Sequence, residues 1–120
     1  MSLQAYQKTQ RSTESPRDTE YRLFAQVTQA LMEANKAGRT NVAQFVDALD
    51  WNRRLWSALA TDCSSKGNQL PDVLRAQIVS LSLWVSRFSS EVAATGASLE
   101  PLIDVNKSIM AGLAQRPSAP

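Results

Sequence analysis

The sequence contains no histidine, and this absence narrows the chemistry open to the chain. Histidine is the commonest general base and the commonest metal ligand in proteins. The remaining serine, cysteine and carboxylate residues show no strained nucleophile turn, and the carboxylates are too scattered for a calcium or zinc site. No glycine-rich loop is present to cradle a phosphate. We therefore expect a protein that is not an enzyme and that uses no cofactor or metal.

Cysteine and long apolar runs are equally scarce. Cys63 is the only cysteine, which excludes an internal disulfide, and we expect it to act as a small buried hydrophobe. No stretch approaches the roughly 20 apolar residues that cross a bilayer. The polar N-terminus has no signal-peptide layout. The sequence therefore predicts a cytoplasmic protein without membrane contact.

Neither basic nor acidic residues are in strong excess. The 13 basic and 11 acidic residues give a net charge of +2, and the basic residues are spread along the chain. A nucleic-acid-binding protein gathers its basic side chains on one surface. We therefore expect no direct contact with RNA or DNA.

What the chain does contain is helical periodicity with few interruptions. Apolar residues recur at three- and four-residue steps, and Gly38, Gly67 and Gly96 stand where such runs stop. No window alternates with period two between hairpin turns. Good capping residues precede the runs. The expected helices cover about residues 15–37, 42–64, 71–95 and 99–114.

These helices predict an all-α fold, an antiparallel up-down helical bundle of four main helices with a shorter fourth helix. The bundle is expected to form one domain over residues 15–114. Residues 1–14 are expected to be flexible or to form one short helix, and residues 115–120 to be a disordered tail. The third helix has the cleanest core stripe, with alternating four- and three-residue steps. Its members are Leu74, Ile78, Leu81, Val85, Phe88 and Val92.

The run Asp47-Ala48-Leu49-Asp50-Trp51-Asn52-Arg53-Arg54-Leu55-Trp56 places two indoles and two arginines in one amphipathic helix. At about 100° per residue, Leu49 and Trp56 share one face, while Trp51 and Leu55 fall on a neighbouring face. This apolar cover is too wide for a single core-facing stripe, so the helix needs two partners. In a chain of 120 residues, the second partner can be another molecule.

Polar residues interrupt two of the apolar rows, at Asn52 and Asn106. A buried amide must find a hydrogen bond, because an unpaired one costs several kcal/mol. Asn52 can satisfy a loop carbonyl or a bound peptide, and Asn106 can fix helix register. Arg53 and Arg54 either cover the indoles with their stems or hold carboxylate and carbonyl groups of a partner. Asp50 is placed to pair with Arg54 on the exposed face.

A second apolar surface is expected on the third helix. Val79 and Leu83 point away from its core stripe, and Trp84 lies on the flank. An exposed patch that contains tryptophan usually marks a partner site. The candidate partner-binding residues are Trp51, Asn52, Arg53, Arg54, Leu55, Val79, Leu83 and Trp84.

The motif Asn52-Arg53-Arg54-Leu55-Trp56 is one of several that agree in order and spacing with a known family. The others lie at residues 19–24, 70–71, 74–78, 81–85 and 102–113. Together they resemble the FlaF family of flagellin-associated regulators and chaperones, over nearly the whole chain. The resemblance implies a role in flagellin production and secretion. It also implies two partners, flagellin and a second regulator that restrains flagellin translation.

Two functions remain open at this point. The leftover apolar surface favours a binding module that shields amphipathic helices of unpolymerised flagellin. The alternative is a self-associating helical protein that acts with the translational regulator and does not capture flagellin. The sequence leaves monomer and homodimer equally open.

Overall fold

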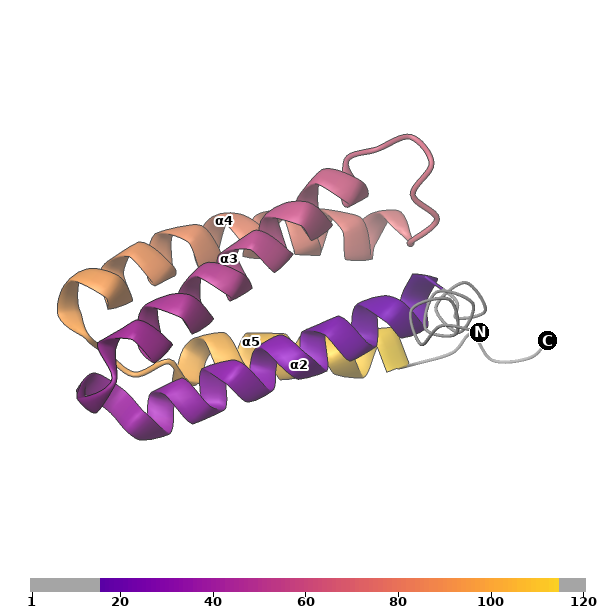
Figure 1. Cartoon of the computed structure of the whole chain (residues 1–120). Helices are drawn as coiled ribbons and strands as arrows, with labels where there is room; N and C mark the ends of the chain where they lie inside the picture. The colour runs from indigo at the N-terminus through magenta and orange to yellow at the C-terminus, as the bar shows by residue number, and fades with distance from the viewer. Residues whose placement is uncertain (1–15, 115–120) are drawn as a thin grey trace, which may run out of the picture.

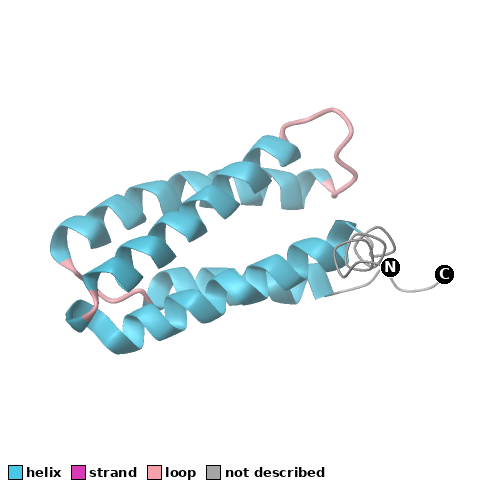
Figure 2. Cartoon of the chain, in the orientation of Figure 1, coloured by secondary structure: helices cyan, strands magenta, loops and turns pink. Residues whose placement is uncertain are grey.

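The computed structural model describes residues 16–114, and the expectations for residues 1–14 and 115–120 lie outside this part of the chain. No strand occurs among the described residues, and the predicted all-α fold is confirmed (Figures 1 and 2). The elements are α2 (Pro16–Ala37), the short 3₁₀ helix η1 (Gly38–Thr40), α3 (Val42–Cys63), α4 (Asp72–Thr95) and α5 (Glu100–Ala114).

The helix boundaries follow from the capping residues. Gly96 ends α4 with a left-handed φ of 69°, and Gly38 follows α2 with a φ of 57°; both are conformations that favour glycine. Asn41 caps α3, because its side-chain oxygen accepts a hydrogen bond from the Gln44 backbone N–H at 3.1 Å. The helix α4 begins at Asp72, one residue later than expected.

Successive helices run in opposite directions, as an up-down bundle requires (Figure 1). The helix α5 has 15 residues, compared with 22 to 24 in the other three, so the short fourth helix is confirmed. The backbone of α5 packs against α2, that of α4 against α3, and α2 joins the two pairs through α3. Within residues 16–114, α4 and α5 make no comparably close backbone approach.

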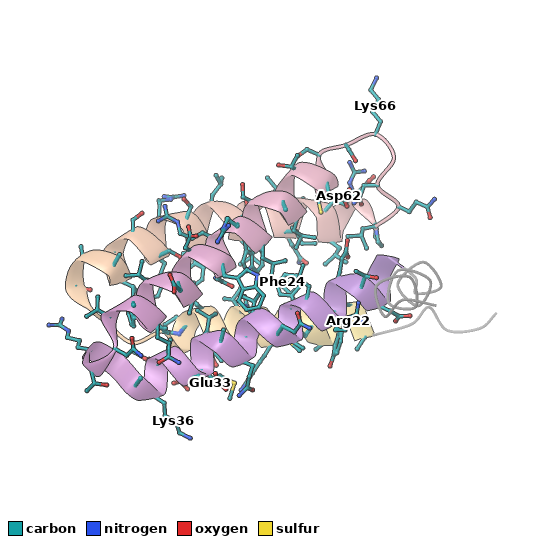
Figure 3. The ribbon with its side chains drawn as sticks, viewed as in Figure 1. Arg22, Phe24, Glu33, Lys36, Asp62 and Lys66 are labelled. Atoms are coloured by element: carbon teal, nitrogen blue, oxygen red, sulfur yellow. The ribbon has the colours of Figure 1, made fainter. Side chains whose placement is uncertain are left out.

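The core lies between the two helix pairs. Phe24 points into this space from α2 (Figure 3) and meets Trp56 edge-on, with ring centroids 5.6 Å apart. None of the described helices combines the length and apolar character needed to cross a membrane. The other apolar side chains with no exposed surface come from α2, α4, α5 and the connection before α5; they are Val27, Leu31, Ala34, Ile78, Val92, Leu99 and Leu102.

The core stripe predicted on α4 is only half correct. Its members Ile78, Val85 and Val92 are buried, whereas the other three are half-buried against the edge of the core. Those three, Leu74, Leu81 and Phe88, lie on one side of the stripe. They remain partly open because the shorter α5 does not pack closely against α4.

The second apolar face of α3 finds its partner inside the chain. Leu49 and Trp56 are buried as expected, and Ala48 and Leu55 are buried as well. Because α2 and α4 both pack against α3, these two helices supply the two partners that the broad apolar cover requires. Trp51 remains exposed on this second face.

Candidate functional site

A buried polar network joins three helices at the centre of the bundle. The Asn106 carbonyl oxygen accepts a hydrogen bond from the Trp56 indole N–H at 2.8 Å. The Asn106 amide donates to the Asn52 carbonyl oxygen at 2.9 Å and to the Thr28 hydroxyl at 3.2 Å. All these groups are buried. The register role expected for Asn106 is consistent with this arrangement, because any shift of α5 along α2 or α3 would break several bonds together.

Two buried polar atoms at the edge of this network have no hydrogen-bond partner among residues 16–114. They are the amide nitrogen of Asn52 and the hydroxyl of Ser89 on α4. Their sequence neighbours, Arg53 and Ser90, are in contact across the α3–α4 seam, so the two atoms belong to the same level of the bundle. Asn52 is fully enclosed and therefore cannot contact a partner on the surface.

The two arginines of the α3 motif have partners within the chain. Arg54 forms an exposed ion pair with Asp50, with the two charged atoms 2.8 Å apart, as the four-residue spacing predicts. The Arg53 guanidinium donates a hydrogen bond to the Ser90 hydroxyl on α4 at 3.3 Å. Both side chains reach solvent, and neither is required by the buried core.

Trp51 lines a surface hollow between α2 and the first half of α3. Its volume is about 390 Å³. The side chain of Trp51 is 38% exposed. The wall on the α2 side consists of Ala30 and Glu33, and the α3 side is formed by Asn41, Ala43, Gln44, Asp47 and Ala48. The lining beside the indole includes alanines on both helices, and their small side chains leave the hollow open.

The eight candidate residues do not form one surface. Trp51 faces α2, whereas Arg53 reaches α4, so the two lie on opposite flanks of α3. Val79 lies about 20° from Ser90 around α4, on the flank that meets α3. Trp84 is about 140° from Val79 on that helix and stacks on Phe88, with centroids 5.0 Å apart.

Burial divides the same eight residues further. Asn52 and Leu55 are buried, Val79 and Trp84 are half-buried, and Leu83 is 57% exposed. The remaining three, Trp51, Arg53 and Arg54, are exposed. The residues that keep a free surface are thus separated by the body of α3 and α4.

The family model for the flagellar protein FlaF matches residues 2–113, which is almost the whole chain. The chain belongs to the FlaF family. This result confirms the resemblance and assigns a flagellar role. No curated protein and no solved structure matches the chain. In this FlaF-family chain, two of the motifs that carry the resemblance meet in space, because Asn52 and Trp56 of one bond to Asn106 of the other.

A second surface hollow in the FlaF bundle lies between the start of α3 and the end of α4. Its volume is about 280 Å³, and its lining is apolar except for Arg39. Val42 and Val46 are 64% and 52% exposed here. The Arg39 guanidinium donates to the Thr95 carbonyl and lies against Gly96, where a larger residue would have to displace it. This guanidinium is the charged part of the lining.

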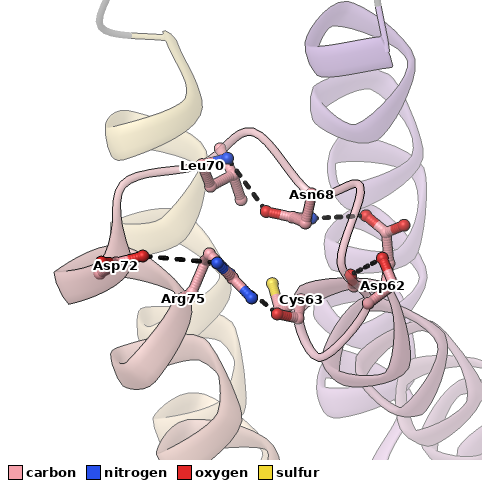
Figure 4. Close-up of polar contacts among 7 residues, drawn as sticks. Asp62, Cys63, Asn68, Leu70, Asp72 and Arg75 are labelled. Carbon is pink, nitrogen blue, oxygen red and sulfur yellow. Dashed lines mark hydrogen bonds and ion pairs between the residues drawn. The ribbon is translucent and has the colours of Figure 1, made fainter.

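Side-chain hydrogen bonds hold the loop between α3 and α4 of the FlaF chain. The Asn68 amide donates to the Asp62 carboxylate at 2.8 Å, and the Arg75 guanidinium donates to the Cys63 carbonyl at 2.9 Å (Figure 4). Cys63 is buried, as expected. Burial raises the pKa of its thiol, the negative charges of Asp62 and Glu20 raise it further, and Arg75 opposes them. A raised pKa keeps the thiol neutral and unreactive.

The hollow beside Trp51 is the feature that the sequence patterns did not reveal. Its two carboxylates, Glu33 and Asp47, come from different helices. Because they lie on two separate helices, no spacing in the sequence connects them. The only available signal was the width of the apolar cover on α3, which indicated surplus surface around Trp51 without locating its neighbours.

Proposed function

We propose that this FlaF-family chain binds unpolymerised flagellin in the cytoplasm and supports flagellin synthesis or export. It acts as a chaperone that shields an amphipathic helix of its client. Family membership supplies the flagellar context. Action together with a second regulator, one that restrains flagellin translation, is part of the proposal and rests on the family resemblance.

One observation supports helix binding above the alternatives. Large apolar side chains remain exposed on both flanks of the first half of α3, where Val42 and Val46 line one hollow and Trp51 lines the other. The core of the bundle is already filled without them. Apolar side chains beside surface hollows suit the spaced anchors of an amphipathic helix.

Calorimetric titration of the full chain with purified unpolymerised flagellin tests the proposal. We expect binding in the micromolar range or tighter, and a loss of about tenfold in affinity for Val46→Ser, because that side chain is an exposed apolar anchor. The matched control is Val73→Ser, since Val73 is exposed at the other end of α4. This control should bind like the unmodified chain.

Two results would argue against the proposal. The first is an absence of binding at tens of micromolar with a folded sample. The second is a stable homodimer by light scattering whose tryptophan fluorescence does not respond to flagellin, which would favour the self-associating protein instead.

A further inference from the structure

The hollow beside Trp51 differs from the other hollow in its charge. Glu33 and Asp47 line it from opposite walls, and no basic residue of the described chain contributes to its lining. Within residues 16–114, neither carboxylate forms an ion pair. Among the same residues, Glu33 accepts a hydrogen bond from the Gln29 side chain, at 3.2 Å. The hollow therefore presents two carboxylates that have no ion pair within the described chain, whose full sequence has a net charge of +2.

The nearest arginines are engaged elsewhere. Arg54 pairs with Asp50 on the outer side of α3, Arg53 reaches Ser90 on α4, and Arg39 is held against the end of α4. None of these three lines the hollow. Lys36, which follows Glu33 by three residues on α2, does not line the hollow either. The contacts of the three arginines thus hold them away from the two carboxylates.

The third element of the hollow is the exposed indole of Trp51. Tryptophan is the aromatic side chain that binds cations best. A guanidinium can stack on the face of the indole while the N–H groups of the guanidinium pair with carboxylates. An indole with one carboxylate on each wall therefore offers both interactions to one cation. The alanines at positions 30, 43 and 48 provide the room for the stem of a long side chain.

We infer that this hollow receives a basic side chain, arginine in preference to lysine, presented by a helix of the partner. That the partner is flagellin rests on the proposed function; the preference for a cation rests on the hollow itself. Phosphate groups are excluded as occupants, because two carboxylates repel them. A purely apolar side chain would leave both carboxylates beside it without a partner and so would bind more weakly.

The cation preference can be tested without flagellin. Nuclear magnetic resonance titration of the full chain would use N-acetyl-arginine amide as the probe and N-acetyl-norleucine amide as its uncharged counterpart. We expect saturable shifts at the Trp51 indole N–H and at the Ala30 and Ala48 amides for the arginine probe alone, at millimolar concentration because the probe is small. The shifts should vanish in the double variant Glu33→Gln/Asp47→Asn. Equal responses to both probes, or no response to either, would overturn the inference.

The same double variant tests whether the hollow contacts flagellin in the complex. We expect Glu33→Gln/Asp47→Asn to weaken flagellin binding about tenfold and to reduce its dependence on salt. The matched control is Glu91→Gln/Asp104→Asn, which makes the same charge change at exposed residues of α4 and α5. It should leave the affinity within about twofold.

The outcomes separate the two proposals. If flagellin fails to bind the unmodified chain while the arginine probe binds the hollow, the proposed function fails and the cation site stands. If flagellin binds and the Glu33/Asp47 variant binds it equally well, the hollow is not the seat of the basic side chain. Self-association abolished by this variant would identify a second copy of the chain as the occupant and would also refute the inference.

Discussion

Trp51 and Trp56 lie five residues apart on α3, yet their surroundings are opposite. The indole N–H of Trp56 bonds to Asn106, its ring meets Phe24, and only 1% of its surface is exposed. Trp51 lines an open hollow beside two carboxylates. The difference is one of neighbours, since both side chains come from the same amphipathic run. Large aromatic residues therefore serve as core or as surface according to whether another helix supplies a partner for the polar edge of the ring.

The largest expected effect comes from removing the acceptor beneath Trp56. Replacement Asn106→Leu leaves the Trp56 N–H and the Asn52 carbonyl buried without partners, and should lower the free energy of unfolding by about 2–4 kcal/mol. Urea unfolding followed by circular dichroism measures it. The control Asp104→Leu alters an exposed residue of the same helix and should stay within about 0.5 kcal/mol. Equal losses for the two variants would show that the network does not stabilise the bundle.

A matched pair of substitutions compares the two indoles directly. Trp56→Phe should lower the free energy of unfolding by about 1–3 kcal/mol, because it removes buried ring volume and a hydrogen-bond donor. Trp51→Phe should cost about 0.5 kcal/mol or less, because that ring is partly exposed. The same urea titrations measure both. Similar losses at both positions would mean that Trp51 belongs to the core after all.

A smaller effect, of opposite sign, is expected on the α4 side of the network. The Ser89 hydroxyl is buried without a hydrogen-bond partner in the described part of the chain, and alanine is the better helix former. Ser89→Ala should therefore raise the free energy of unfolding by up to about 1 kcal/mol. A decrease of similar size would instead indicate a bridging water that extends the network from Asn52 to α4.

The smallest effect is a pH dependence of the stability, which arises from Cys63 on the buried face of α3. Because burial, then Asp62 and Glu20, raise the pKa of the Cys63 thiol in the folded state, folding favours the protonated thiol. This contribution is complete below the pKa of the unfolded thiol and is lost as pH rises through the folded pKa. Under reducing conditions, stability should fall more steeply above about pH 8.5 in the unmodified chain than in Cys63→Ala. Parallel curves would contradict the raised pKa.

Much of the fold could be predicted because its signals are local. Gly96 ends α4 through its left-handed backbone conformation, and this position was identified from the sequence. Asn41 caps α3 through a single side-chain bond, where the sequence left the cap open between Thr40 and Asn41. The need of Asn52 and Asn106 for hydrogen bonds was also visible, because each interrupts an apolar row. That they bond to each other was not, since nothing in the spacing of two separate helices gives their relative rotation.

The surface could not be predicted for the same reason. The sequence gives the helix on which each of Trp51, Arg53 and Trp84 lies. Whether each side chain meets solvent or another helix depends on where the neighbouring helices pack. The sequence could not show that Leu55 is buried while Trp51 on the same face stays exposed, or that Glu33 would stand opposite Asp47. Each of these results depends on how two helices are rotated against each other.

Because α4 and α5 do not pack closely, we expect the helices of the bundle to differ in the free energy needed to unfold them. Hydrogen bonds in the interior tie α2, α3 and α5 together. Within residues 16–114, the side-chain hydrogen bonds that join α4 to other elements lie near its ends and at Ser90. We therefore expect α4 to separate from the bundle in a partial unfolding in which the other three helices stay packed. Its amide protons should exchange with solvent through a partial unfolding of lower free energy than the global one.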